Sequence, residues 1–574
     1  MYADVVVLTY QAPDINYFTY LVPKNLEKEI KVGQLVEVPF GKRNPIGIVT
    51  QTFDKDSPLQ RRILSKIKPI RSVAFSTPIL LPYQVELLKW MSAYYLAPMV
   101  NCLEAMLPTA ALNVKRLTAN AKLEKSFSPS SLGVSQSIIL VPTINRIPQA
   151  LAQFPKAKNY AIYHNELKTG EKFATWLKII SGNVDFIFGS RSAIFTPCPN
   201  LTQIKIYDEH ETVYKDERSP YFCTLTVAEK ISKLTGAQIQ IVDPSPKIST
   251  YFLMPKNTYI TQSKIKYHIV SMQNERLMQN FGPISDSLLS HLKKNAAGGK
   301  NSLLFLNKKK EVGVLFCKDC KNSQYLEKQP ESCPNCQSSD FNFNVLNISS
   351  LAQEVKSKVP SAKINLMSED TRLSSDRQST IDIATAAVFY APLVKKYDLV
   401  AHIQTDTLIN RADFSSNEIL FNQITDLKKL LKIGGSLILQ TYNPDQPVLK
   451  AATHGNYLIY YENQLSQRRL LAYPPFGLLI KLTLKGLRKE QVEEKAQQLS
   501  QTLKANLLSL LPFTILGPYQ PIFFSKQTTY NIILKCKLNS YTLEERQKTI
   551  EKLSPILRKI ERGWQITVEP ESIN

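Results

Sequence analysis

Glycine is scarce in this chain, and it has neither a long apolar run nor a secretory signal. Only 19 of the 574 residues are glycine, about half of the usual frequency of about 7%. Loops that wrap phosphate groups need glycine, because only its backbone approaches a ligand so closely. No segment nears the ~20 apolar residues of a membrane span, and Met1–Tyr10 has Asp4 but no basic stretch. We therefore expect a cytoplasmic protein without a membrane partner.

The chain is long and strongly basic. Its formal net charge is +23, its isoelectric point is about 9.4, and hydrophobic residues make up 43% of it. At roughly 100–200 residues per domain, this length predicts several packed domains. An excess of lysine and arginine attracts polyanions, because contacts with phosphates release counterions. The charge favours a nucleic-acid partner, although a lysine-rich composition alone would give the same balance.

The eight cysteines form two sets. Four stand alone and are expected to be reduced core residues, namely Cys102, Cys198, Cys223 and Cys536. The others form two C-x-x-C pairs, Cys317 with Cys320 and Cys333 with Cys336. Two such turns supply the four thiolates of a tetrahedral Zn²⁺ site. Four cysteines complete the ligand set and leave no open position, so one structural zinc ion is favoured over a catalytic ion or a metal-free loop.

The order of expected elements divides the chain into regions. Short β-rich segments followed by a helix predict a small β domain at 1–110. A polar linker is expected at 111–135. Strands then alternate with helices at 136–260 and again at 261–454, which predicts two parallel sheets, with the cysteine segment 312–342 inserted into the second. Strands and long helices at 455–574 predict a C-terminal α+β domain. The expected fold class is multidomain α/β.

Short strings along the chain resemble the PriA primosomal helicase family (primosomal protein N′). No single string is decisive, but their order matches the family over nearly the whole chain. The matching strings include Phe18-Thr-Tyr-Leu21, Val38-Pro-Phe-Gly-Lys42, Gly189-Ser-Arg-Ser-Ala-Ile-Phe195, Asp208-Glu-His210, Gln440-Thr-Tyr-Asn-Pro444 and Tyr473-Pro-Pro-Phe476.

The resemblance implies a domain order and a DNA-binding pocket. It makes 1–110 a 3′-end DNA-binding domain, and 136–260 and 261–454 two RecA-like helicase lobes. The residues implied to hold a 3′-terminal nucleotide are Phe18, Thr19, Tyr20, Gly41 and Lys68. The family has aspartate where Thr19 stands, which puts base readout in doubt. Alternatively, Phe18 and Tyr20 are ordinary strand residues that face one side of a sheet.

The chain lacks the family's ATP-hydrolysing residues. A phosphate loop reads G-x-x-x-x-G-K-[ST], but Gly41-Lys42 is followed by Arg43, and Gly299-Lys300 by Asn301. The family's D-E-E-H string is reduced to Asp208, Glu209 and His210, and its two motif-VI arginines become Leu430 and Ile433. The linker at 111–135 replaces the family's winged helix and phosphate-loop region. We expect no catalytic residue and no ATP or Mg²⁺, so enzymatic activity is uncertain.

The function implied is a nucleoid-associated replication-restart protein. It would bind forked or single-strand-containing DNA and support primosome assembly without ATP hydrolysis. Primosome proteins and the replicative helicase are its expected partners. Two alternatives stay open: an active 3′→5′ helicase with diverged motifs, and a structural or regulatory partner that does not bind DNA.

Overall fold

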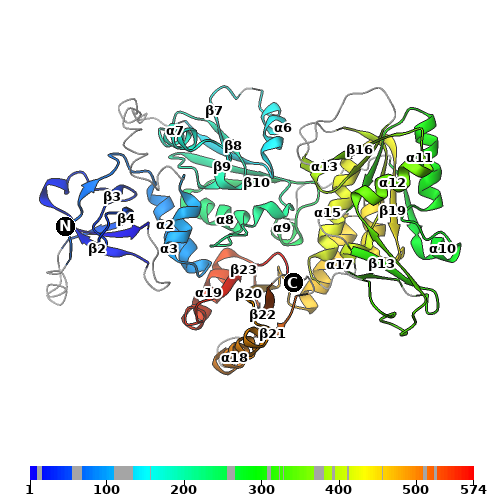
Figure 1. The fold of residues 1–574 in the computed structure, drawn as a ribbon. Coiled ribbons are helices and arrows are strands. Elements are labelled where there is room, and N and C mark those ends of the chain that lie inside the picture. The colour runs from blue at the N-terminus through cyan, green and yellow to red at the C-terminus, as the bar shows by residue number, and fades with distance from the viewer. Residues whose placement is uncertain are drawn as a thin grey trace. The chain divides into compact units, whose positions relative to one another are not determined.

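A computed structural model of the chain (Figure 1) places most residues in two compact units, which are described separately. Unit 1 comprises 1–253 and 467–574, and unit 2 comprises 254–466. The structure describes residues 1–8, 16–54, 67–108, 134–155, 157–254, 265–306, 312–321, 323–326, 329–367, 380–390, 395–409, 413–455, 457–507, 513–521 and 527–574. The expected linker at 111–135 lies outside these ranges except for its last two residues.

The N-terminal domain is an antiparallel sheet in the order β2-β1-β4-β3-β5. The strands are β1 (Tyr2–Val7), β2 (Phe18–Leu21), β3 (Leu35–Glu37), β4 (Ile46–Phe53) and β5 (Ser72–Val73), followed by helices α2 (Pro82–Tyr94) and α3 (Met99–Met106). Valines and isoleucines of β1, β3 and β4 are almost fully buried, as β-branched residues on a packed sheet face should be.

The next part of unit 1 is a parallel sheet, hereafter lobe 1. The strand order is β10-β9-β6-β8-β7. From the central strand β6, the chain first forms β7 and β8 on one side of β6, and then crosses to form β9 and β10 on the other side. The strands are β6 (Gln136–Leu140), β7 (Tyr160–Tyr163), β8 (Phe186–Gly189), β9 (Leu201–Tyr207) and β10 (Gln238–Val242). The helices are α6 (Ile147–Ala152), α7 (Thr169–Ile180), α8 (Thr224–Thr235) and α9 (Ile248–Leu253). Ligands of such sheets bind at the carboxyl ends of the strands, near the reversal point between β6 and β9.

Unit 2 contains a second, six-stranded parallel sheet, in the order β11-β19-β18-β12-β17-β16. Its strands are β11 (Lys266–Ser271), β12 (Ser302–Phe305), β16 (Lys363–Met367), β17 (Thr380–Ala384), β18 (Tyr397–His402) and β19 (Leu431–Thr441). Its helices are α10 (Met272–Leu277), α11 (Asp286–Ala297), α12 (Ile348–Lys358), α13 (Ala387–Tyr390), α14 (Asp406–Ile409), α15 (Ser416–Lys429), α16 (Pro447–His454) and α17 (Tyr457–Leu470). The reversal point here lies between β12 and β18.

A small antiparallel sheet interrupts unit 2 between β12 and α12. It consists of β13 (Val312–Cys317), β14 (Ser323–Leu326) and β15 (Phe341–Leu346), in the order β14-β13-β15. Its own core holds Leu315, Cys317 and Cys333, with a few half-buried neighbours. A core this small cannot stabilise a sheet unaided, so the segment depends on its cysteines and on the lobe beneath it.

The C-terminal part of unit 1 is an antiparallel sheet in the order β21-β22-β20-β23. Its elements are β20 (Gly477–Gly486), α18 (Lys489–Leu507), β21 (Phe513–Tyr519), β22 (Thr528–Lys537), α19 (Leu543–Leu557) and β23 (Trp564–Val568). Strand β21 was not predicted from the sequence. The parallel and antiparallel sheets together confirm the predicted α/β fold class, and no described helix is long and apolar enough to cross a membrane.

Candidate functional site

Strand β2 carries three of the residues implied to bind DNA. Phe18 and Tyr20 point to the same face and belong to the core cluster of the N-terminal domain. Tyr20 is 4% exposed, and its hydroxyl donates to the carbonyl of Pro39 at 3.4 Å. Phe18 is half-buried and packs edge-on against Phe40, with 5.1 Å between ring centroids. Phe18 thus retains partial access to solvent, whereas Tyr20 is a core residue that supports the strand.

Thr19 faces the opposite side and is paired with an acid. It lies directly across from Asp4 of β1, and its hydroxyl donates a 2.7 Å hydrogen bond to the Asp4 carboxylate. A carboxylate therefore stands beside the position where the family has aspartate, but it comes from the neighbouring strand. Asp4 was not among the residues predicted from the sequence; the β1–β2 register is the signal that identifies it.

Gly41 and Lys68 lie on exposed backbone in the same domain. Phe40 and Arg43 exchange backbone hydrogen bonds of 2.9 and 3.1 Å around Gly41 and Lys42. Gly41 has φ +60°, which suits the first position of a type II′ hairpin turn and favours glycine. Lys68 is exposed, and its carbonyl accepts from the Leu21 amide at 3.0 Å, which fixes it beside the end of β2.

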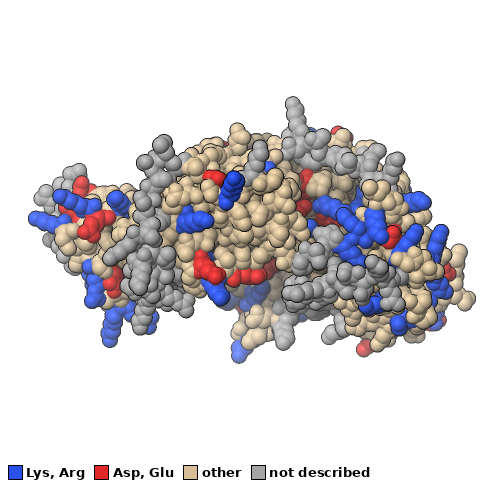
Figure 2. Space-filling model, turned by 90° about the horizontal axis from the view of Figure 1, so that it is seen from above, with Lys and Arg blue, Asp and Glu red and all other residues tan. Residues whose placement is uncertain are grey.

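The exposed surface of this domain is predominantly basic. Lysines and arginines stand there among fewer acids (Figure 2). The exposed basic residues are Lys24, Lys28, Lys31, Lys42, Arg43, Lys68 and Arg71. Arg61, Arg62 and Lys66, which the sequence also assigns to this surface, lie outside the described residues. The arrangement offers cations to a phosphate backbone.

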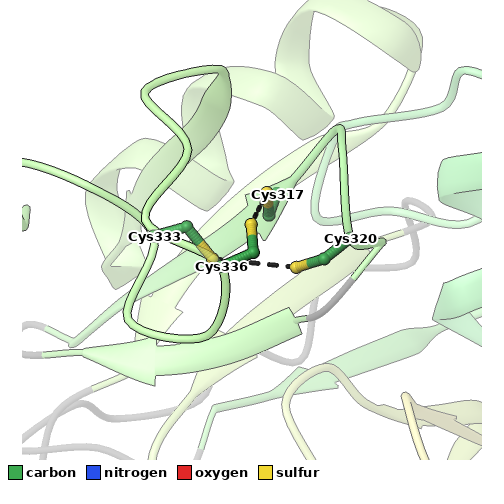
Figure 3. A group of neighbouring side chains, drawn as sticks. All are labelled: Cys317, Cys320, Cys333 and Cys336. Atoms are coloured by element: carbon green, nitrogen blue, oxygen red, sulfur yellow. Dashed lines mark hydrogen bonds between the residues drawn. The ribbon is translucent and has the colours of Figure 1, made fainter.

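The four clustered cysteines converge on one point (Figure 3). The sulfurs of Cys317 and Cys336 are 3.5 Å apart and those of Cys320 and Cys333 are 3.8 Å apart; all four lie within 4.8 Å of one another. Zn–S bonds of about 2.3 Å in a tetrahedron place sulfurs about 3.8 Å apart. The predicted ligands are therefore brought together, with spacings that suit a tetrahedral thiolate metal site.

At the carboxyl edge of lobe 1, the remnant of the D-E-E-H string follows β9. Asp208 adopts a left-handed backbone with φ +46°. The His210 ring nitrogen Nδ1 and backbone amide both contact the Asp243 carboxylate, at 2.7 and 2.9 Å. Tyr207 aligns with the family's metal-binding aspartate, and its hydroxyl donates a 2.9 Å hydrogen bond to the side-chain oxygen Oε1 of Gln153. These hydrogen bonds join the string to Asp243 and Gln153 of lobe 1.

Glu209 is the buried acid of this edge. It is 3% exposed, and its carboxylate accepts from the Lys247 amide at 3.1 Å. Burial raises its pKa to about 7, a shift that Lys247 opposes and Asp243 reinforces. The Lys247 ammonium itself binds Glu571, from the C-terminal segment, at 2.7 Å. Asp243, Lys247 and Glu571 were not predicted as part of this edge, because nothing in their local sequence indicates that they meet.

The G-S-R-S-A-I-F string also lies at this edge, and its arginine is fully engaged. Arg191 Nη1 donates to the carbonyls of Val213 and Lys215 at 2.6 and 2.8 Å, and Nη2 binds the Asp216 carboxylate at 3.1 Å. The adjoining cavity of about 570 Å³ has both positive and negative residues in its wall. Phe222 is a core residue, buried against Phe195 with 5.0 Å between ring centroids.

In unit 2, the two positions that correspond to family arginines, Leu430 and Ile433, carry apolar side chains. Leu430 is buried at 3% exposure, and Ile433 is 97% exposed. Gly299, whose glycine-lysine pair resembles part of a phosphate loop, lies before β12, whereas such a loop follows a strand and opens a helix.

Comparison with known proteins agrees with the extent of the N-terminal domain. The family model of the PriA 3′ DNA-binding domain matches residues 6–108. The chain is 27% identical over 478 residues to the replication restart protein PriA of Bacillus subtilis, which covers 72% of this chain and 59% of that protein. It is 29% identical over 448 residues to PriA of Synechocystis sp., a match that covers 67% of this chain and 53% of that protein. It is 24% identical over 594 residues to PriA of Rickettsia conorii, a match that covers 87% of this chain and 89% of that protein. The chain thus spans little more than half the length of the first two relatives.

Among solved structures, that of S. cerevisiae Dbp5 bound to RNA and ADP BeF3 matches 67% of this chain and 91% of its own, at 10% identity. The TM-score of this match is 0.29.

The N-terminal β domain, the two parallel sheets and the inserted cysteine cluster define a multidomain α/β protein. Its N-terminal domain matches the PriA 3′ DNA-binding domain, and most of the chain is similar to PriA replication restart proteins.

The buried Glu209 predicts a dependence of stability on pH. Because the folded state holds its proton more tightly than the unfolded chain, this group stabilises the fold below about pH 4.5 and the contribution is lost as pH rises through about 7. A shift of this size corresponds to roughly 3 kcal/mol. Glu209→Gln mimics the protonated acid and should raise the melting temperature at pH 8.5 much more than at pH 5, measured by thermal denaturation.

Glu217→Gln, at an exposed position of the same edge, serves as the control and should leave the pH profile unchanged. Equal gains at pH 5 and pH 8.5 for Glu209→Gln would show that its carboxyl does not titrate in this range.

Proposed function

We propose that this protein binds the free 3′ end of a DNA strand at a fork through its N-terminal domain, and supports replication restart without hydrolysing ATP. The observation that carries the proposal is the match of residues 6–108 to the PriA 3′ DNA-binding domain. Primosome proteins and the replicative helicase are its proposed protein partners, because a protein without its own motor needs others to open the duplex.

In the proposed pocket, exposed and half-buried residues contact the DNA, and buried residues support them. Lys68 meets a phosphate near the end of the strand, and the exposed turn at Gly41 lets the DNA backbone approach closely. Phe18 offers a half-buried ring to a base. The half-buried Thr19 hydroxyl meets a base edge, and its hydrogen bond to the buried Asp4 carboxylate orients it. Tyr20 positions the strand from the core side.

The lack of an ATP site is proposed on three grounds. The two Gly-Lys pairs are followed by Arg43 and Asn301, not by serine or threonine. Glu209 is buried against the Lys247 segment, so its carboxylate is not poised to orient water. Leu430 and Ile433 cannot stabilise a transferring phosphoryl group.

We propose zinc as the ion of the cysteine cluster. Four thiolates in two C-x-x-C turns are the usual ligand set of a closed structural zinc site, and bound metal would stabilise a sheet with so small a core.

The metal proposal predicts one zinc ion per chain, measured by elemental analysis of the purified protein. Cys333→Ser removes a buried ligand and should lower the zinc content well below one and make the segment sensitive to protease. Cys223→Ser, outside the cluster, should keep the full zinc content. A parent protein without zinc, or a Cys333→Ser variant that retains it, would contradict the assignment.

The pocket predicts a preference for a fork with a free 3′ hydroxyl over the same fork ending in a 3′ phosphate. Lys68→Ala should remove most of that preference, because this contact forms only when the 3′ end occupies the pocket, and a net hydrogen bond is worth about 1 kcal/mol, or roughly fivefold in affinity. The measurement is fluorescence anisotropy of labelled forks. Lys31→Ala, another exposed lysine of this domain, should lower affinity for both forks alike.

The same titration, repeated across salt concentrations, tests whether DNA is a ligand at all. A surface with several phosphate contacts should lose affinity steeply as salt rises. Undetectable binding at low salt would favour the structural-partner alternative. Preference for the free 3′ end that survives Lys68→Ala would instead refute the assigned pocket.

ATP turnover separates this proposal from an active helicase. Phosphate release with fork DNA and Mg²⁺ should equal that of a protein-free control, because no loop is available to hold the triphosphate. Release that Glu209→Gln abolishes would establish a working ATPase and overturn the proposal.

A further inference from the structure

The four clustered cysteines differ in their exposure to solvent. Cys317 and Cys333 are fully buried, Cys320 is half-buried, and Cys336 is exposed. All four side chains point toward one another in Figure 3. A small reagent that approaches the cluster from solvent therefore meets Cys336 before the other three.

The backbone of the second C-x-x-C turn holds Cys336 at the surface. The Gln337 amide donates to the Cys333 carbonyl at 2.8 Å, and the Cys333 amide donates to the Ser338 carbonyl at 2.7 Å. Gln337 has a left-handed backbone, with φ +62°. These two hydrogen bonds close the turn around the buried Cys333, so the exposure of Cys336 follows from the path of the chain.

A second sulfur lies within reach of the exposed one. The sulfurs of Cys317 and Cys336 are 3.5 Å apart, and a disulfide bond needs them to approach by only about 1.5 Å more. Cysteines that sense oxidants are accessible thiolates placed beside a second cysteine that can form a disulfide. Cysteines that bind a metal are thiolates, so the cluster combines accessibility, thiolate character and a neighbouring sulfur.

The structure of the inserted sheet depends on these cysteines. Its own core contains three buried residues, Leu315, Cys317 and Cys333, and two of them are cluster members. Where a metal organises so small a core, its binding energy is part of the folding energy. The first cysteine turn also meets α10, because the Lys321 carbonyl accepts from Gln273 at 2.7 Å. A chemical change at the cluster would therefore alter the whole inserted sheet.

We propose that Cys336 and Cys317 form a reversible oxidation site, at which hydrogen peroxide converts the two thiolates to a disulfide and the bound zinc ion is released. This inference rests on the zinc assignment proposed above.

The reaction has two steps. The Cys336 thiolate attacks one peroxide oxygen: an S–O bond forms, the O–O bond breaks, and hydroxide leaves, which gives a sulfenic acid. The Cys317 thiolate then attacks that sulfur: the S–S bond forms, the S–O bond breaks, and a second hydroxide leaves. The two sulfurs together lose two electrons, which the peroxide gains. The zinc ion leaves with its charge unchanged because two of its four ligands are lost, and a dithiol reverses the oxidation by exchange.

The test is the rate at which hydrogen peroxide releases zinc from the full-length protein, measured with a chromogenic chelator after the zinc content has been determined. Cys336→His retains four zinc ligands, because histidine also binds zinc, but removes the exposed sulfur. It should slow the release by about tenfold or more, since oxidation follows accessible thiolates. The matched control, Cys320→His, also replaces one ligand but leaves both reacting sulfurs, and should release zinc at the parent rate.

Peptide mapping of the oxidised parent protein covers the case in which Cys336→His fails to fold or to hold zinc. The first disulfide to appear should join Cys317 to Cys336; trypsin separates Cys317 from Cys320 at Lys318, and fragment spectra distinguish Cys336 from Cys333. Dithiothreitol with added zinc should remove this disulfide and restore the zinc content.

The outcomes separate this inference from the zinc assignment. A parent protein that carries zinc but keeps it in peroxide, an unchanged release rate in Cys336→His, or a first disulfide without Cys336 would overturn the oxidation site alone. A parent protein that contains no zinc before peroxide is added would overturn the zinc assignment, and this inference with it.

Discussion

The guanidinium of Arg546 is the contact on which the arrangement of unit 1 depends. It is 2% exposed and lies between the carboxylates of Glu229, on α8, and Glu569, just after β23. Burial alone would raise the pKa of Glu569, but Arg546 outweighs it and holds that pKa below its ordinary value. A buried arginine is tolerated only with such partners. The C-terminal domain is therefore tied to lobe 1, and its last residues stay at the edge of that lobe.

That attachment determines the chemistry of the lobe 1 edge. The Lys215 ammonium donates to the Val568 carbonyl at 2.6 Å, and Lys247 binds Glu571. Arg191 holds the backbone at Val213 and Lys215. Groups that could meet a phosphate are thus satisfied by the chain itself. Such a network favours a rigid scaffold over a site that rearranges during a reaction cycle, which agrees with the proposed loss of ATP hydrolysis.

The sequence predicted what depends on local pattern and missed what depends on distant pairing. The alternation of strands and helices predicted the parallel sheet of lobe 1, and two C-x-x-C turns predicted the cysteine cluster. Strand β21 was missed because Gly517 and Pro518 resemble a turn, and its pairing with β22 does shift register between Leu516 and Tyr519. The contacts of Glu209, like the pairing of Thr19 with Asp4, arise only when separate strands or segments come together.

A parallel sheet can outlast the loss of its phosphate loop because the two have different physical bases. The sheet is held by buried strands such as β6, β8 and β18, whose central residues are almost fully inaccessible. A phosphate loop lies at the edge of such a sheet and contributes little apolar burial, so replacing its glycine and lysine leaves the core intact. The carboxyl edges then remain as concave surfaces, with a cavity of about 570 Å³ lined by charged residues in lobe 1 and one of about 400 Å³ in unit 2. The edge of such a sheet thus stays available as a concave surface whether or not a phosphate loop is present.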